Sequence, residues 1–194
     1  MQPHVLIVTA HPSSKGFTHR IANAFKEGAE AAGKTVEILD LYKTDLQMGY
    51  LKFEEKIDMS NPNPVREKLQ AKVTAATELV FVHPMWWMAP PAIMKNFLDN
   101  VLAGRFAFKY QAGSPIPIGL LKGKFGHVFI TSDGPMWIYT LFALPFRIIW
   151  NTFIFRFCGI TPTTLRVFDK KLFRSEPEMV TFLDKVKKIA GKKR

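Results

Sequence analysis

The stretch Pro84-Met-Trp-Trp-Met-Ala-Pro-Pro-Ala-Ile-Met-Lys-Asn-Phe-Leu-Asp-Asn-Val101 decides the fold, because a strand pattern enters it and a helix pattern leaves it. Residues 78–83, Glu-Leu-Val-Phe-Val-His, form an apolar run typical of a strand buried inside a sheet. Pro84 has no N–H for the sheet and is expected to end this strand. Pro91 suits the first position of the following helix. This order predicts one unit of a parallel α/β sheet.

The loop between this strand and this helix is unusually bulky. It holds Met85, Trp86, Trp87 and Met88, whereas turns of this kind favour small and polar residues. Open α/β sheets bind ligands in the crevice outside the carboxyl ends of their strands. We therefore expect this loop to contact a flat aromatic ligand. The alternative is that both tryptophans are buried in the core or in a subunit interface.

The rest of the chain alternates between strand and helix patterns. Further strands are expected at residues 4–10, 35–41, 124–132 and 164–168, and helices at 20–32, 64–76, 91–102 and 177–190. Thr18 is expected to cap the first helix. The alternation predicts an α/β flavodoxin-like three-layer sandwich, with a five-stranded parallel sheet in the order 2-1-3-4-5 and helices on both faces. Residues 1–194 are expected to form a single domain.

The composition excludes several classes of protein. The chain has 194 residues, of which 47% are hydrophobic, and these proportions suit one domain with a full core. Its one cysteine, Cys158, excludes an internal disulfide framework and a cysteine-ligated metal site, and is expected to be buried. No metal-ligand spacing and no signal peptide are recognisable, so a cytoplasmic location is expected.

The most apolar stretch, Trp137–Ile160, is long enough to suggest a membrane span. It contains Pro145, Arg147, Asn151 and Arg156, however. An arginine near the middle of a membrane-spanning helix costs roughly 2.5–3.5 kcal/mol on insertion scales. The stretch is therefore expected to be a buried or interface-forming segment.

Positive charge collects at the C-terminal end. The net charge is +11, and residues 161–194 carry ten Lys/Arg but four Asp/Glu. Six of those ten lie in Lys185–Arg194. One interpretation is a solvated helix end whose cations suit the helix dipole. The other is attraction to anions such as a nicotinamide-nucleotide phosphate or an anionic membrane face. No nucleic-acid motif accompanies the charge, so no nucleic-acid partner is expected.

Three loops are expected to meet at one edge of the sheet: His11–Thr18, Pro84–Pro90 and Thr131–Tyr139. The first offers hydroxyl groups and a helix N-terminus, which suit a phosphate. The second offers indole and sulfur surface, and the third offers backbone N–H groups in Thr131-Ser132-Asp133-Gly134. A phosphate joined to a flat polar heterocycle indicates a flavin nucleotide, although the pattern also admits another nucleotide.

The motifs resemble those of the NAD(P)H:quinone oxidoreductase family, flavodoxin-like flavoproteins that include DT-diaphorase and modulator of drug activity B. The resemblance rests first on Pro84-x-Trp-Trp-x-x-Pro-Ala-Ile-x-Lys-x-Phe-x-Asp-x-Val, with one extra proline at 90–91. Arg105-Phe-Ala-Phe-Lys-Tyr110, His11 with Phe17-Thr18, and Phe157-Cys-Gly159 follow in matching order. The similarity spans nearly the whole chain.

The resemblance implies two-electron hydride transfer from NADH or NADPH, through N5 of a bound FAD or FMN, to a quinone or similar acceptor. It implies three groups of site residues. The flavin phosphate would be held by His11, Phe17 and Thr18; the ring by Met85, Trp86, Trp87 and Met88; and its pyrimidine edge by Thr131, Ser132, Asp133 and Gly134. Phe108 and Tyr110 would line the substrate cavity, and Tyr139 would act near the flavin carbonyls as the catalytic residue. The family forms its sites at a homodimer interface.

Two residues depart from the family pattern. Asp133 stands where mammalian members have glycine, and no histidine follows His127, although the family has one shortly after the position of Tyr139. Three other activities remain open: nitro- or azo-reduction in the same site, a flavodoxin-like electron carrier, and a regulatory subunit docked on a membrane transporter. In the last case the basic C-terminus would be the docking surface, and the protein would lie at the inner face of the membrane.

Overall fold

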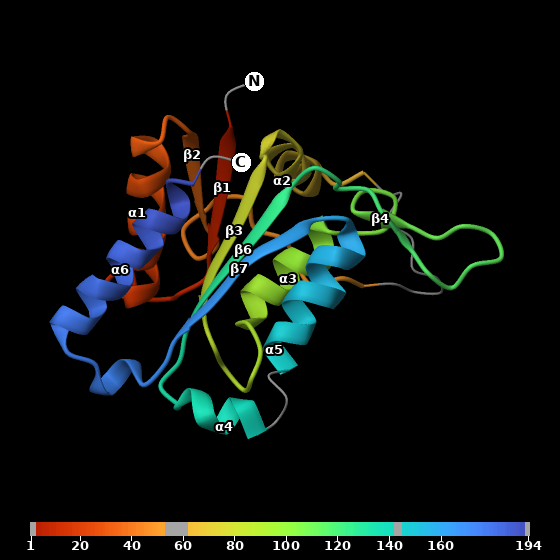
Figure 1. Ribbon diagram of the computed structural model, residues 1–194. Coiled ribbons are helices and arrows are strands. Elements are labelled where there is room, and N and C mark those ends of the chain that lie inside the picture. Colours follow the sequence, from red (N-terminus) through yellow and green to blue (C-terminus); the bar gives the residue numbers. More distant parts are fainter. Residues whose placement is uncertain (1–2, 53–61, 142–144, 193–194) are drawn as a thin grey trace.

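The computed structural model describes residues 3–52, 62–141 and 145–192. Its central sheet contains five parallel strands in the order β2-β1-β3-β6-β7, so the predicted order 2-1-3-4-5 is confirmed. The strands are β1 (His4–Thr9), β2 (Thr35–Asp40), β3 (Glu78–Pro84), β6 (Phe125–Thr131) and β7 (Thr161–Phe168). Figure 1 shows β3 near the middle of the sheet, with helices on both sides.

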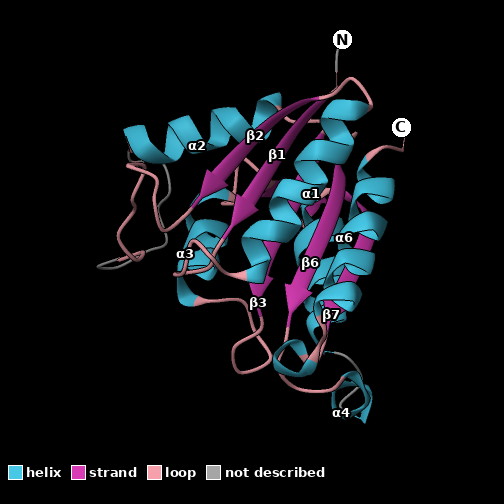
Figure 2. Ribbon diagram, turned by 90° about the vertical axis from the view of Figure 1, so that its left-hand side faces the viewer, coloured by secondary structure: helices cyan, strands magenta, loops and turns pink. Residues whose placement is uncertain are grey.

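Helices cover both faces of the sheet, and alternate strand residues point into two separate cores. On one face α1 (Phe17–Ala31) and α6 (Glu176–Ala190) pack on residues such as Ile7, Val80 and Phe129. The other face is covered by α2 (Pro64–Ala75), α3 (Ala92–Val101), α5 (Pro145–Ile148) and the π-helix η1 (Ile149–Arg156). Figure 2 shows the layers from the side. Burial on both faces explains why the strands are continuous apolar runs rather than alternating patterns.

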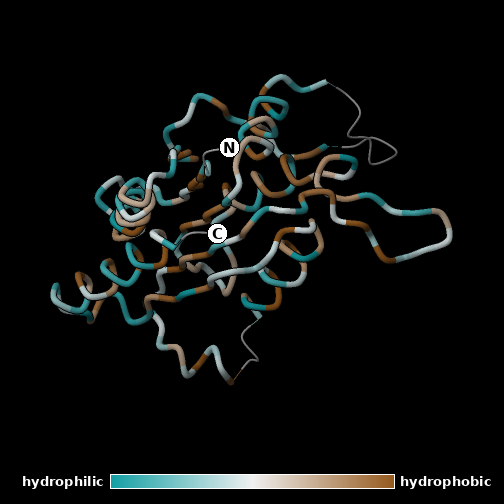
Figure 3. Tube along the Cα trace, turned by 45° about the horizontal axis from the view of Figure 1, so that its top comes forward, coloured by the Kyte–Doolittle hydropathy of each residue, from teal (hydrophilic) through white to brown (hydrophobic). Residues whose placement is uncertain are grey.

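The hydropathy of the chain follows this layered arrangement. Figure 3 shows hydrophobic residues along the central strands and more hydrophilic residues along the outer helices and the long hairpin loop. The predicted burial of Cys158 is confirmed, since its side chain lies in the core beneath η1. Within the described residues, no helix combines the length and the apolarity that a membrane crossing requires.

Two local features differ from the sequence-based expectations. The first helix begins at Phe17 with Gly16 as its N-cap, so the expected cap at Thr18 is wrong. Thr18 is instead buried in the first turn, where its hydroxyl lies 3.4 Å from the hydroxyl of Thr131. The apolar stretch after β6 contains α4 (Met136–Leu141), α5, which begins at Pro145, and η1. A short hairpin of β4 (Phe108–Lys109) and β5 (Ile118–Gly119), which the sequence analysis did not anticipate, follows α3.

A buried charged cluster joins several elements at the amino end of the sheet. Lys34 Nζ donates to Glu78 Oε1 at 2.6 Å and to the carbonyls of Ala190 and Lys192 at 2.9 Å each. His127 Nε2 lies 3.2 Å from the other carboxylate oxygen of Glu78. Burial alone would raise the pKa of Glu78, but the hydrogen bonds from His127 and Lys34 outweigh it and hold this pKa below its usual value. The cluster therefore ties β2, β3, β6 and the end of α6 together.

Removing the buried cation is expected to destabilise the fold strongly. Lys34→Met should lower the free energy of unfolding by about 3–5 kcal/mol, because the carboxylate of Glu78 stays buried without its lysine partner. Urea denaturation at pH 7 measures this. Lys95→Met, which removes the cation of the exposed Lys95–Asp99 pair, is the matched control and should change stability by less than about 0.5 kcal/mol. Equal losses in the two variants would contradict this account.

The same pair predicts an acid-sensitive contribution to stability. Because the folded-state pKa of Glu78 is depressed, its stabilising effect is complete above the pKa of the unfolded chain. That effect is lost as the pH falls through the folded-state value.

Candidate functional site

The structure brings the three predicted loops together at the carboxyl ends of β1, β3 and β6. Ala10 N–H donates to Val82 O at 3.1 Å and Met85 N–H donates to Thr131 O at 2.8 Å, so each loop begins beside its neighbour. In Figure 2 the strand arrows point toward this edge, where α4 also lies. β1 lies between β2 and β3, so the chain changes direction across the sheet at this point. Open α/β sheets bind ligands at such a crevice.

The β1–α1 loop forms a cradle for an anion. Ser13 N–H donates to Nδ1 of His11 at 3.1 Å, which fixes the imidazole beside the start of α1. A Cβ on Gly16 would lie 2.6 Å from that ring, so glycine is required there. Within the part of the chain that the structure describes, no side chain caps the N-terminus of α1, so its first N–H groups are available to an anion.

Burial lowers the pKa of His11 and the charge of Lys171 adds to this effect, while the carbonyl oxygen of Ser13, 3.0 Å from Nδ1, opposes it. This lowered pKa favours the neutral imidazole of His11, which offers hydrogen bonding rather than charge. Lys171, in the segment after β7, lies near enough to His11 for its charge to lower the pKa of that imidazole.

Two predicted phosphate-binding residues point into the core. The ring of Phe17 packs on Phe168 with centroids 4.6 Å apart, and Thr18 is almost completely buried. Their side chains pack into the core and so hold the first turn of α1 in place. Only the backbone N–H groups of these two residues can therefore contact a phosphate at the loop edge.

The β3–α3 loop is a tight turn in a strained conformation. Trp86 and Ala89 exchange two backbone hydrogen bonds of 2.9 and 3.0 Å, and the two residues between them, Trp87 and Met88, have φ values of 52° and 62°. Asn and Gly are the residues that normally occupy such positions, because left-handed backbone costs other residues about 1–2 kcal/mol each. Strain of this kind concentrates at binding sites.

The turn holds its tryptophans outside the core. Trp87 is 99% exposed and Trp86 is also exposed, so the alternative that both are core residues is wrong. The turn thus carries bulky side chains in a costly conformation and leaves one of them with almost no contact inside its own chain. Met85 packs against the core beneath it. This arrangement suits a surface that a flat ligand covers.

The β6–α4 loop is organised around a hydroxyl pair. Ser132 Oγ lies 2.5 Å from Tyr139 Oη and also accepts the Gly134 N–H at 3.2 Å. A Cβ on Gly134 would lie 2.5 Å from Tyr139 Oη, so glycine allows the phenol to reach Ser132. Asp133 points to solvent at the tip of the loop, and Thr131 contacts Thr18 across the sheet edge. The loop therefore places Tyr139 close to backbone N–H groups.

His83 is a site-adjacent residue to which the sequence analysis assigned no role. Its Nδ1 lies 2.8 Å from Pro84 O, and its ring stacks on Trp150 with centroids 5.4 Å apart. Among the described residues its Nε2 has no hydrogen-bond partner. Burial lowers the pKa of His83 to about 4, so the ring is neutral at pH 7. It lies beneath the strained turn, in a small apolar cavity that Met85 and Met88 also line.

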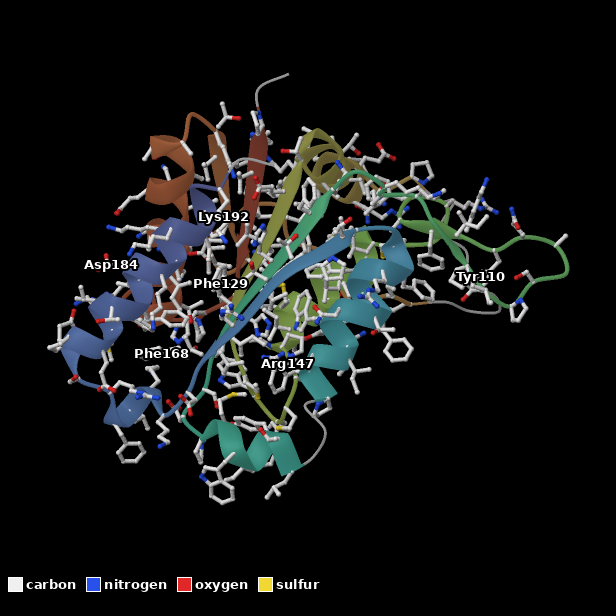
Figure 4. All side chains as sticks on the ribbon, viewed as in Figure 1. Tyr110, Phe129, Arg147, Phe168, Asp184 and Lys192 are labelled. Atoms are coloured by element: carbon white, nitrogen blue, oxygen red, sulfur yellow. The ribbon has the colours of Figure 1, made fainter. Side chains whose placement is uncertain are left out.

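The predicted substrate residues lie elsewhere in the same chain. Phe108 packs edge-on against Phe157 with centroids 4.7 Å apart, and Tyr110 is exposed on the hairpin. Figure 4 shows Tyr110 far from α4 and the loop edge. Between these two places runs an apolar groove of about 580 Å³, lined from Ala89 and Pro90 along α3 and η1 to Phe108. The groove therefore connects Phe108 with the β3–α3 loop of the same chain, whereas Tyr110 is not among the residues that line it.

Comparison with known proteins agrees with this geometry. A family model described as a flavodoxin-like fold matches residues 3–189. An uncharacterised NAD(P)H oxidoreductase of Haemophilus influenzae is 31% identical over 170 residues, which cover 84% of this chain and 82% of that protein. The FMN-dependent NADH:quinone oxidoreductase 2 of Bacillus subtilis is 31% identical over 138 residues, 62% of this chain and 64% of that protein.

A solved structure is similar over almost its full length. A crystal structure of a Streptococcus mutans UA159 protein matches with a TM-score of 0.83 and 28% identity, and the match covers 97% of this chain and 98% of that one.

The strained turn predicts opposite effects on stability and on ligand binding. In Trp87→Gly the left-handed backbone is no longer strained, so the free energy of unfolding of the ligand-free protein should rise by about 1 kcal/mol. Affinity for added FMN or FAD should fall by about tenfold or more, because an aromatic contact is lost. Urea denaturation and quenching of flavin fluorescence measure the two effects.

Trp86→Gly is the matched control within the same turn. Trp86 is not among the described residues with positive φ, so this variant should gain no stability. Equal changes in stability for the two variants, or unchanged flavin affinity in Trp87→Gly, would contradict the role assigned to the turn.

Proposed function

The chain belongs to the NAD(P)H:quinone oxidoreductase family of flavodoxin-like proteins, and from this we propose that it is a flavin-dependent NAD(P)H dehydrogenase that reduces quinones. The observation that carries the proposal is the strained, solvent-facing Trp87 turn between an anion cradle and Tyr139. A flavin nucleotide has an anionic phosphate and a flat polar ring. At the carboxyl edge of the sheet, the β1–α1 loop suits the phosphate, and the Trp87 turn and the loop with Tyr139 suit the ring.

The residues present fit a flavin. The N-terminus of α1 and the neutral imidazole of His11 would hold the phosphate. Trp87 and the neighbouring turn would cover the ring, while the N–H groups around Gly134 would meet its pyrimidine edge. Both FMN and FAD carry this phosphate and ring, so the cradle suits either. When bound, the flavin supplies the hydride chemistry at N5, by which NAD(P)H and a proton convert a quinone to a quinol.

Tyr139 is the side chain best placed to assist that chemistry. Its hydroxyl is held by Ser132 at 2.5 Å and can donate a proton or a hydrogen bond toward the pyrimidine edge. The chain has no histidine beyond His127, so no imidazole shares this task from the following segment. Lys15, Lys170 and Lys171 lie on the surrounding loops and favour the approach of NAD(P)H phosphates.

The experiment that tests the function follows the colour of the flavin without oxygen. NADH or NADPH should bleach the flavin-loaded protein, and a short-chain benzoquinone should restore the colour. An electron carrier without a hydride-donor pocket would not be bleached by either nucleotide, and that result would overturn the proposal. Comparing kcat/KM for a benzoquinone with that for azo and nitro compounds decides between quinone reduction and the alternative activities.

We also propose that the protein works as a homodimer. The groove between α3 and η1 is apolar and leaves Phe153 and Ile149 exposed. Phe108 lines this groove, and Figure 4 shows Tyr110 on the hairpin, far from the end of the molecule that carries α4. A second copy seated on this groove would bury the exposed residues and could bring its own Phe108 and Tyr110 to the site. The substrate cavity would then be completed by both chains.

The groove predicts a change of oligomeric state. Phe153→Asp introduces a charge into the proposed interface and should convert a dimer to a monomer with lower quinone reductase activity. Light scattering measures the mass. Ile116→Asp, at an exposed position of the loop between β4 and β5, is the control and should remain dimeric. A wild-type protein that is monomeric with its flavin bound would contradict the proposal.

A transporter or membrane contact through the basic C-terminus is the remaining alternative. Lys192 O accepts from Lys34 at the amino end of the sheet, and Figure 1 places the C-terminus at the end of the molecule opposite α4. A contact made through this tail would therefore point the three loops away from the partner. We propose a cytoplasmic location for the protein.

A further inference from the structure

The carboxyl edge of the sheet carries exposed apolar side chains beside the site. Four of them form what we term the edge patch: Trp137 and Leu141 on α4, and Leu172 and Phe173 on the short helix η2 (Lys171–Phe173). Their exposed fractions are 64%, 73%, 68% and 81% in that order. Large apolar side chains exposed together usually mark an interaction surface.

Both elements of the edge patch are fixed to the site loop. Met136 N–H at the start of α4 donates to Asp169 Oδ2 at 2.9 Å. Lys171 N–H donates to Ser132 O at 3.0 Å, which connects η2 to the same loop. Figure 1 shows α4 and the turn before α6 beyond the ends of the strands, on the side where the three loops open. A surface that covers the edge patch would therefore face the site.

Several exposed cations, together with the exposed Asp133, lie on the segments next to the edge patch. Lys15, Lys170 and Arg147 are exposed on the adjoining segments, and none of them forms an ion pair with another described residue. The cations of Arg174 are already paired with Asp169 and Glu178. Protein surfaces that bind in the headgroup region of an anionic bilayer combine exposed Trp, Phe and Leu with neighbouring Lys and Arg.

We propose that the edge patch docks the protein on an anionic lipid bilayer and opens the site toward quinones dissolved in the membrane. This inference rests on the proposed quinone reductase activity for its substrate class. An anionic bilayer complements the cations around the patch, whereas a second copy of this chain would present the same cations and be repelled. The groove assigned to the second copy lies along α3 and η1, and its lining residues include none of the four patch residues.

Vesicle flotation with the flavin-loaded protein tests the docking directly. Wild-type protein should float with vesicles of phosphatidylglycerol and phosphatidylcholine and should bind pure phosphatidylcholine much less. Leu172→Ser together with Phe173→Ser should weaken binding by about tenfold or more, since two apolar side chains are removed from the contact. Absence of wild-type binding, or equal binding to neutral vesicles, would overturn the proposal.

Matched variants elsewhere separate the patch from general charge and hydrophobicity. Ile116→Ser with Val180→Ser removes two exposed apolar side chains outside the patch and should leave binding unchanged. Lys185→Gln with Lys188→Gln removes two of the six positive charges of Lys185–Arg194 and should reduce binding by less than the patch variant. A larger loss with the tail variant would overturn the proposal in favour of tail docking.

Activity measurements distinguish failure of docking from failure of the proposed function. The Leu172→Ser, Phe173→Ser variant should reduce a water-soluble benzoquinone as wild type does but should lose activity with a long-chain isoprenoid quinone in anionic vesicles. If wild type reduces neither quinone, the enzyme proposal fails, whereas flotation still decides the docking. If the variant instead changes the mass in solution from dimer to monomer, the patch is an interface between copies, and the membrane proposal is overturned.

Discussion

The parallel pairing of β1 with β3, and of β3 with β6, is the constraint on which the site depends. These pairings start the three functional loops from neighbouring strand ends, and the Met85–Thr131 hydrogen bond continues the alignment beyond the last strand residues. Because β2 pairs on the other side of β1, the helices that follow β1 and β3 leave on opposite faces of the sheet. The crevice between them is left open. The strand order therefore creates the place where a ligand can bind, and the loops decide which ligand.

The two ends of the sheet are built for different purposes. At the amino end, the cluster of Lys34, Glu78 and His127 satisfies its buried charges and binds the last turn of α6. At the carboxyl end, left-handed backbone and exposed indole appear within one turn, at Trp87. Such a turn can persist because the strand before it and the helix after it are fully packed. The packed sheet and helices thus hold the turn at Trp87 in a backbone conformation that costs stability but suits ligand binding.

Most of the fold was predictable from the sequence, and the reason is physical. Apolar runs bounded by proline and glycine identify buried strands, and their alternation with amphipathic helices leaves few topologies. The start of α1 was harder, because Thr18 is a good capping residue by type, while tertiary contacts with Thr131 and the packing of Phe17 place it inside the helix. The π-helical turn of η1 and the β4–β5 hairpin likewise depend on tertiary contacts rather than on local patterns.

The site itself was predictable as a set of loops but not in its detail. Residue types cannot show that Trp87 has positive φ and faces solvent, or that His83 is buried with an unpartnered Nε2 among the described residues. The positions of Phe108 and Tyr110 required coordinates as well, since sequence order does not reveal the distance between the hairpin and the loop edge. Those three observations turn the cofactor expectation into the proposal that a second chain contributes to the site.

The most direct test of the account is hydrogen–deuterium exchange with and without FMN. The account predicts slower exchange in the segments 11–18, 85–90 and 131–139 when FMN is bound, with no change at the amino end of the sheet around Lys34. Protection confined to other segments, or an exchange pattern that FMN leaves unaltered, would contradict the claim that these three loops hold a flavin.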